Sequence, residues 1–331
     1  MYLDRIKIYN DIEALRNSKV IFYATSDRVN AGTQINPDIL DYFLEHLDTF
    51  KGVNKISLIL YTLGGNTLAA WNIVNLLKEF CNELEIIIPN KCRSAGTLMA
   101  LGANTIIMTK QATLGPIDPS LTGPLNPIIP GTNPPIKSPV SVESVKGFFA
   151  LLQEQFGVNN NISKGNAYNK LCDYVNPLLL GDVYRSQKQI KMLATKLLSS
   201  HISKKRRVKR IVNFLCSDTG SHDYTISRTE GRHLGLNIES PSEKLYDNLK
   251  LLYNDFTDEM EIFTPYDAVK ILGNNNSINF SFKRTLLESV EYGQNVYISE
   301  GKLSKVTNPQ TLKVDIRNDI TFEGWRHNNG S

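Results

Sequence analysis

Strand-like runs alternate with helices through the first third of the chain, and this alternation is what most limits the possible fold. Short apolar runs read as buried strands over 19–25, 55–62, 85–88 and 105–108. Helices are predicted between them, over 37–48 and 67–80 and from Ser94 to about 103. Strands that alternate with helices favour a parallel sheet with right-handed crossovers. Ligands and substrates bind beyond the carboxyl ends of such strands, so we expect the chemistry at that edge.

Ser94 lies where the third strand-like run turns sharply into a helix. Pro89 and Asn90 end the β-branched run, and small residues typical of a closely packed helix follow Ser94. A hydroxyl at this place sits beside backbone N–H groups and the positive end of a helix dipole, which suits a nucleophile. Serine at a helix start is more often an ordinary N-cap, however. The surrounding string, 92–96, also lacks the first glycine of the hydrolase nucleophile elbow, so both interpretations stay open at this point.

A pair of glycines marks the same edge one strand–helix unit earlier. Gly64 and Gly65 follow the strand-like run 55–62 and precede the helix 67–80. Such a pair is usually a plain turn. It also lets the backbone approach a substrate closely and turn an N–H group inward, which an oxyanion hole requires. Together with Ser94, the pair predicts a site for acyl transfer.

Composition sets broad limits on the class of protein. The 331 residues are 41% hydrophobic and 21% charged, as in an ordinary globular protein of one large domain or two. A net charge of +4 does not favour nucleic acid or membrane as the main partner. No apolar run is long enough to span a bilayer, and the amino terminus lacks the apolar segment of a signal peptide. The four cysteines have no metal or redox spacing, so we expect reduced thiols, no cofactor and a cytoplasmic location.

The rest of the chain predicts a loop, two helices and a hairpin. The segment 116–139 is rich in proline and glycine and predicts a long functional loop. A helix follows over 141–155, and one long helix is predicted over 183–216. This helix carries the basic run Lys204–Arg210, which we interpret as a solvated face or a subunit contact rather than a nucleic-acid site. The tail alternates in strand fashion over 278–306 and predicts a C-terminal hairpin.

These motifs resemble those of a known family. Residues 60–65, Leu-Tyr-Thr-Leu-Gly-Gly, resemble the Thr-Pro-Gly-Gly loop of ClpP-fold serine peptidases, with Leu63 in place of proline. The strings at 94–103 and 114–119 are similar to those of the serine dehydrogenase proteinases, which are distant relatives of ClpP and of signal peptide peptidase A. The segment that starts at Ser221 resembles that family's later, histidine-bearing segment. The resemblance covers roughly residues 18 to 305.

The resemblance implies an α/β fold with a ClpP/crotonase-like repeated β-β-α core, a parallel sheet, extra helices and a C-terminal β-hairpin. We take 1–240 as the peptidase domain, including the loop 116–139 and the helix 183–216, and 241–331 as a helix-plus-hairpin extension. Relatives usually self-associate, so we expect a homo-oligomer that acts on polypeptide. No P-loop motif is present, so any ATPase or other activator would be a separate protein.

The resemblance implies a triad in the order Ser, Asp, His. Ser94 would be the nucleophile and His222, which follows a Thr-Gly-Ser turn, the general base. Asp118 would orient the base, because the prolines that flank it in Gly-Pro-Ile-Asp-Pro restrict the backbone and so fix its direction. Asp223 is the alternative orienter. Backbone N–H groups of Gly64 or Gly65 and of Ala95 would hold the oxyanion. The predicted activity is that of a cytosolic serine endopeptidase acting through an acyl-enzyme.

Three alternatives stay open. The first is a Ser–Lys dyad of the signal peptide peptidase A type, for which Lys146 is the best-placed lysine if its neighbours bury it. The second is a crotonase-like enzyme that acts on acyl thioesters and uses the N–H donors without Ser94. The third is a non-catalytic assembly protein in which the basic run contacts nucleic acid. A Ser94→Ala variant separates the first from the second.

Overall fold

The computed structural model describes residues 2–117, 120–121, 123–132, 134–218, 221, 223–307 and 314–328. These residues group into two compact units. The first unit comprises Met1–Leu114 and Ser227–Ser331, and the second comprises Gly115–Ile226. Asp118 and His222 lie outside the described residues.

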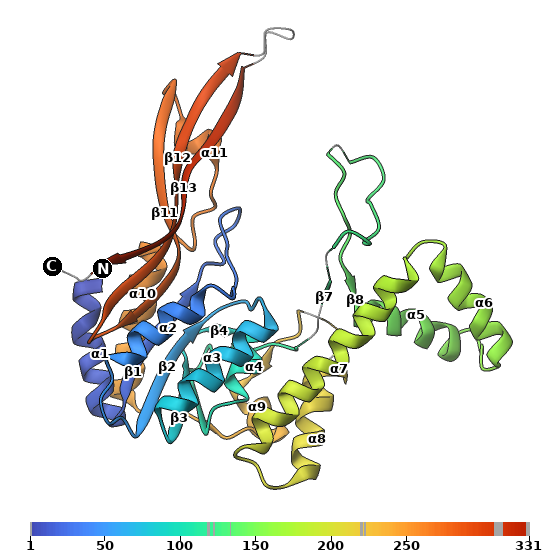
Figure 1. Ribbon diagram of the computed structural model, residues 1–331, viewed down its shortest axis with the longest axis horizontal. Helices are drawn as coiled ribbons and strands as arrows, with labels where there is room; N and C mark the ends of the chain where they lie inside the picture. The colour runs from blue at the N-terminus through green and yellow to red at the C-terminus, as the bar shows by residue number, and fades with distance from the viewer. Residues whose placement is uncertain are drawn as a thin grey trace. The chain divides into compact units, whose positions relative to one another are not determined.

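The first unit is built on an eight-stranded sheet (Figure 1) with the order β10-β5-β3-β2-β1-β11-β12-β13. The strands from β10 to β1 are parallel, and those from β11 to β13 are antiparallel additions. The sheet strands are β1 (Lys19–Thr25), β2 (Lys55–Tyr61), β3 (Glu83–Ile88), β5 (Thr105–Met108), β10 (Ile238–Glu239), β11 (Ser277–Ser289), β12 (Gly293–Thr307) and β13 (Val314–Asn328). The short strands β4 (Lys91–Cys92) and β6 (Thr113–Leu114) pair outside this sheet, and β9 (Ile226–Ser227) precedes α9. The predicted fold class, α/β with a mostly parallel central sheet, is confirmed.

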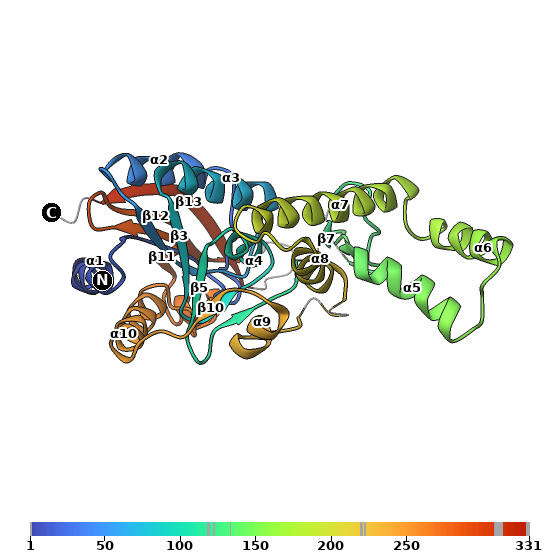
Figure 2. The same ribbon diagram turned by 90° about the horizontal axis from the view of Figure 1, so that it is seen from below.

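Helices cover both faces of this sheet, which explains the continuous apolar character of its parallel strands. Figure 2 shows α2 and α3 on one face and α1 and α10 on the other. The helices of the unit are α1 (Tyr2–Arg16), α2 (Ile39–Asp48), α3 (Thr67–Phe80), α4 (Ala95–Ala100), α9 (Arg228–Leu234), α10 (Glu243–Glu259) and α11 (Ala268–Leu272). Beneath α1 and α10 lies a core in which Tyr9, Phe22 and Phe256 are fully buried. The helices predicted over 37–48 and 67–80 are confirmed as α2 and α3.

The C-terminal hairpin predicted over 278–306 is confirmed as β11 and β12. It also continues the main sheet, because β11 pairs antiparallel with β1, with Tyr23 opposite Leu287. The sequence did not indicate β13. This strand pairs along β12, but all of its side chains are exposed or half-exposed. Such a strand carries little apolar pattern to detect. The domain division at residue 240 stays a prediction.

Helix α1 was not predicted either, and its buried face explains why. That face consists of Tyr2, Arg5, Tyr9 and Ile12. A charged residue and two tyrosines at helical spacing do not form an apolar stripe, which is the usual signal of an amphipathic helix. The burial of Arg5 depends on acidic residues more than 240 positions away along the chain. Only the folded chain brings them together.

The second unit is mainly helical and contains β7 (Ser120–Leu121), β8 (Val140–Ser141), α5 (Val142–Glu154), α6 (Asn161–Cys172), α7 (Pro177–Ser199), α8 (Lys205–Asn213) and a π-helical turn (Phe214–Asp218). The proline-rich segment between β7 and β8 has no helix among its described residues, as expected. The prediction of one helix over 183–216 is wrong, because α7 ends at Ser199 and α8 begins at Lys205. The Ser200 hydroxyl donates to the Leu197 carbonyl oxygen at 2.7 Å, and such local bonds compete with helix continuation.

His46 on α2 is fully buried against the C-terminal hairpin. Its Nε2 lies 2.8 Å from the Asn295 side-chain oxygen, so this nitrogen donates, and its Nδ1 lies 2.7 Å from Ser289 Oγ. Burial lowers the pKa of His46 to about 4, with a smaller contribution from His327, although the bond to Asn295 acts in the opposite direction. The neutral ring therefore joins α2 to β11 and β12.

We expect this histidine to make stability depend on pH. The pKa of His46 is lower in the folded chain than the ordinary value of 6.5, so the folded state binds fewer protons. The free energy of unfolding should therefore fall as the pH drops from about 7.5 to about 5, by about 2 kcal/mol from this group. Urea unfolding of the wild type and of His46→Gln at both pH values measures the effect. Equal pH dependence in the two proteins would contradict it.

Candidate active site

Ser94 occupies a strained turn between β4 and α4. Its backbone angles are φ 51° and ψ −116°, a conformation that residues with a side chain rarely adopt. Such strain costs on the order of 1–3 kcal/mol and is typical of functional sites. The Ser94 side chain makes no capping hydrogen bond to α4, although the residue stands at the N-cap position. The ordinary explanation of this serine, a helix cap, therefore does not fit its geometry.

The Gly64 backbone lies directly against Ser94. A Cβ added to Gly64 would lie 2.8 Å from Ser94 Cβ and 3.1 Å from the Ala95 nitrogen, and the φ of Gly64 is +114°. Both the space and the conformation therefore require glycine. Gly65, with φ +143°, is equally restricted, because an added Cβ would lie 2.4 Å from the Ile35 nitrogen. The close approach predicted from the glycine pair is thus present on one side of Ser94.

The backbone donors at this turn are not equivalent. The Gly64 N–H donates to Thr62 Oγ1 at 3.0 Å, and Thr62 Oγ1 lies 2.7 Å from Thr25 Oγ1. Within the described part of the chain, the N–H groups of Gly65 and Ala95 have no hydrogen-bond acceptor. Two buried or half-buried donors without an acceptor beside a strained serine can stabilise a negative oxygen.

Thr62 connects the glycine loop to the serine turn. Its N–H donates to the Lys91 carbonyl oxygen, and its carbonyl oxygen accepts from the Arg93 N–H, each at 3.0 Å. Its methyl group packs on Gly96, where an added Cβ would lie only 2.4 Å away. These contacts fix the relative position of the two loops before any substrate binds, which is what a preorganised site requires.

Charged and polar groups that the sequence did not single out lie at the same edge of the sheet. Asp27, which follows β1, accepts from the Tyr61 hydroxyl at 2.8 Å and pairs with Lys91 on β4. Burial, followed by the proximity of Asp27, raises the pKa of Tyr61 well above its ordinary value. The Nε of Arg93 is buried and has no partner among the described residues. The only feature of the sequence that could have indicated Asp27 and Lys91 is their position. Asp27 lies two residues after β1, and Lys91 is the first residue of β4.

The predicted bases and orienters are only partly described. Asp118 and His222 lie outside the described residues, so their roles stay predictions. Lys146 belongs to α5 of the second unit, where it pairs with Glu143 at 2.8 Å and its side chain is 40% exposed. Asp223 is exposed in a turn, and its N–H donates to Ser221 Oγ at 3.2 Å. The structure thus brings together Ser94, the glycine pair and Ala95.

The described residues form neither a metal site nor a membrane-spanning helix. No three or more His, Cys, Asp or Glu side chains are grouped so that they could hold a metal ion. Among the helices of the described ranges, none has both the length and the apolar character to cross a membrane.

Several known proteins are similar to this chain. Two uncharacterized proteins of Methanocaldococcus jannaschii, MJ0137 and MJ1495, are each 28% identical to it over 259 residues. The alignment covers 76% of this chain and 79% of MJ0137, and 75% of this chain and 76% of MJ1495. Among solved structures, the 1510-N membrane-bound stomatin-specific protease aligns over 70% of this chain and 85% of its own, with 16% identity and a TM-score of 0.40. ClpP1 from Listeria monocytogenes aligns over 71% of this chain and 98% of its own, with 13% identity and a TM-score of 0.37.

A family model matches the part of the chain that holds the candidate site. The match spans residues 47–130, and the family is described as ClpP-like SDH-type serine proteinase. Gly64, Gly65 and Ser94 all fall inside the matched segment. Over residues 47–130 this chain is therefore matched to the ClpP-like SDH-type serine proteinases, the family that its motifs resemble.

Proposed function

We propose that this protein is a serine peptidase that cleaves peptide bonds through an acyl-enzyme on Ser94. The observation that carries the proposal is the strained, uncapped Ser94 with the Gly64 backbone packed against it. The family match over residues 47–130 supports the same chemistry. In this proposal the protein acts on polypeptide substrates as a homo-oligomer in the cytoplasm. Any activator would be a separate protein.

The proposed reaction proceeds in two steps. The base takes the proton of Ser94 Oγ as this oxygen bonds to the peptide carbonyl carbon, and the C–N bond then breaks as the base returns the proton to the leaving amine. Water, activated by the same base, next hydrolyses the Ser94 ester. We assign the base to His222 and its orientation to Asp118, as the family resemblance implies.

The oxyanion donors follow from the hydrogen bonds at the glycine loop. Because Thr62 Oγ1 holds the Gly64 N–H, we assign the oxyanion hole to the N–H groups of Gly65 and Ala95. Gly64 would then act by its lack of a side chain, which leaves room for Ser94. A single oxyanion-hole donor contributes about 3–4 kcal/mol of transition-state stabilisation.

Labelling with a fluorophosphonate tests the nucleophile and its base. We expect one adduct, on Ser94, that is located by mass spectrometry of the digested protein. His222→Ala should slow labelling on the order of 100-fold or more, because the serine loses its base, whereas Lys146→Ala should label at the wild-type rate. The reverse pattern would assign a Ser94–Lys146 dyad. An unlabelled Ser94 in folded protein would contradict the hydrolase and favour an enzyme that uses only the backbone donors.

A further inference from the structure

The positive charge of this protein is concentrated on one short segment. Six of the seven residues in Lys204–Arg210 are basic, and none is acidic. The rest of the chain holds 31 basic and 33 acidic residues, so without this segment the net charge changes from +4 to −2. The modest overall charge therefore conceals a strong local positive field.

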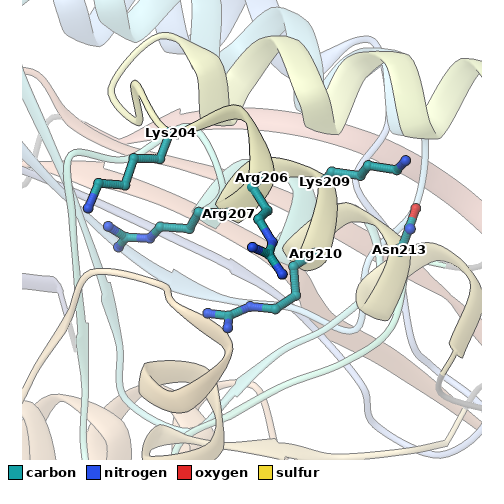
Figure 3. Close-up of a pocket in the computed structure, with 6 residues that line it drawn as sticks. All are labelled: Lys204, Arg206, Arg207, Lys209, Arg210 and Asn213. Carbon is teal, nitrogen blue, oxygen red and sulfur yellow. The ribbon is translucent and has the colours of Figure 1, made fainter.

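Helix α8 turns these charges outward. Its apolar residues Val208, Ile211 and Val212 are buried in the second unit, so the helix has one packed face. The basic side chains occupy the remaining surface, and Figure 3 shows Lys204, Arg207 and Arg210 extending to one side of the helix and Lys209 to the other. An open groove of 620 Å³ is lined by Lys204, Arg206, Arg207, Lys209, Arg210 and Asn213. We call these residues with Lys205 the α8 basic surface.

Several cations of the α8 basic surface have no neutralising partner. Within the described residues, no carboxylate forms an ion pair with Lys204, Lys205, Arg206 or Lys209. Other exposed cations of the same unit do have acids nearby, such as Lys170 with Asp173 at 3.0 Å and Arg185 with Asp182 at 3.8 Å. Like charges packed this closely repel each other, and an anionic ligand would relieve that repulsion.

The sequence alone favoured a solvated face or a subunit contact for this run, but the groove and the cations without a carboxylate partner point to a ligand. We propose that the α8 basic surface binds the phosphate backbone of a nucleic-acid duplex without reading its sequence. The charge density of the surface matches that of a duplex. The seven residues Lys204–Arg210 rise about 10 Å along the helix axis, and a duplex presents one phosphate per about 1.7 Å of axis, or about six over that length. Six cations match this density. Arginine, which supplies three of the six, also binds phosphate in a bidentate manner.

Other polyanions fit these observations less well. An extended peptide advances about 3.3 Å per residue with alternating faces, so only about two acidic side chains would face the helix over the same length. A membrane-surface helix needs an exposed apolar face, and the apolar face of α8 is buried. A single strand is usually held by stacking on aromatic side chains, and the groove lining contains none.

Fluorescence anisotropy with a labelled duplex of mixed sequence, about 24 base pairs long, tests the proposal on the full chain. Between about 50 and 300 mM NaCl, the plot of log K against log salt should have a slope of about −4, because each phosphate contact contributes about −0.9. The variant K205Q/R206Q/K209Q removes three of the four exposed cations for which the described residues provide no carboxylate partner. Its slope should be shallower by about 3, and its affinity near 100 mM NaCl lower on the order of 100-fold.

A matched variant removes the same charge elsewhere in the second unit. K170Q/R185Q/K188Q should bind within about 3-fold of the wild type if the α8 basic surface is the site. A wild-type slope flatter than about −1, or equal losses in the two triple variants, overturns the proposal. Tighter binding to polyglutamate or to phosphatidylserine vesicles than to the duplex also overturns it, in favour of an acidic protein or a lipid surface. The wild-type slope can overturn the proposal even if the α8 variant fails to fold, because it needs no substitution.

Discussion

Replacing Ser94 with alanine is expected to lower kcat/KM for a peptide substrate by a factor on the order of 10⁴ to 10⁶ and to leave stability almost unchanged. The loss is large because the acyl-enzyme cannot form, and only the oxyanion donors and substrate binding remain. Stability should change by no more than about 0.5 kcal/mol, because the Ser94 hydroxyl makes no capping bond that alanine would break.

Ser227 offers a matched control for this prediction. It is a serine at the N-cap of a helix, α9, and its side chain accepts from the Glu230 N–H at 3.3 Å. Ser227→Ala should therefore lower the free energy of unfolding by about 1 kcal/mol and keep the peptidase activity. Steady-state kinetics and urea unfolding of both variants give the comparison. If Ser94→Ala keeps its activity, or loses stability as Ser227→Ala does, Ser94 is a structural residue.

Replacing Arg5 with methionine is expected to lower the free energy of unfolding by about 3–5 kcal/mol, the largest effect on stability that we expect from a single substitution. Arg5 is fully buried, and its Nε donates to Glu288 at 2.9 Å. Its guanidinium also pairs with Asp255 and Glu259 on α10. Methionine fills much of the volume but leaves Glu288, which is also fully buried, without its cation.

A second substitution separates charge from packing. In the Arg5→Met background, Glu288→Gln removes the unpaired charge and should recover at least about 1 kcal/mol, although Glu288→Gln alone should be destabilising. Lys170→Met serves as the surface control, because the exposed pair of Lys170 and Asp173 contributes about 1 kcal/mol or less. Urea unfolding of the wild type and of the four variants measures these values. A loss below about 1 kcal/mol for Arg5→Met would show that the buried pair does not hold α1 in place.

Local patterns were sufficient for the parallel part of the sheet. The runs at β1, β2, β3 and β5 are apolar because helices cover both faces, and a continuous apolar run is visible in the sequence itself. The strand ends then placed Gly64, Gly65 and Ser94 at a common edge, which predicted the core of the candidate site. Helix α1, strand β13 and the break between α7 and α8 lacked such patterns.

The order of residues by itself determined where the parallel strands and the helices α2 and α3 lie, and which glycines and which serine meet at the edge of the sheet. Those properties depend on neighbours a few positions away. Only the tertiary structure decided that Ser94 is strained and uncapped, that Thr62 holds the Gly64 N–H and leaves Gly65 to donate, and that Arg5 is buried. The position of Thr62 depends on its contacts with Thr25, Lys91 and Arg93, and the burial of Arg5 depends on acidic residues more than 240 positions away. No local pattern records the free energies of such long-range contacts.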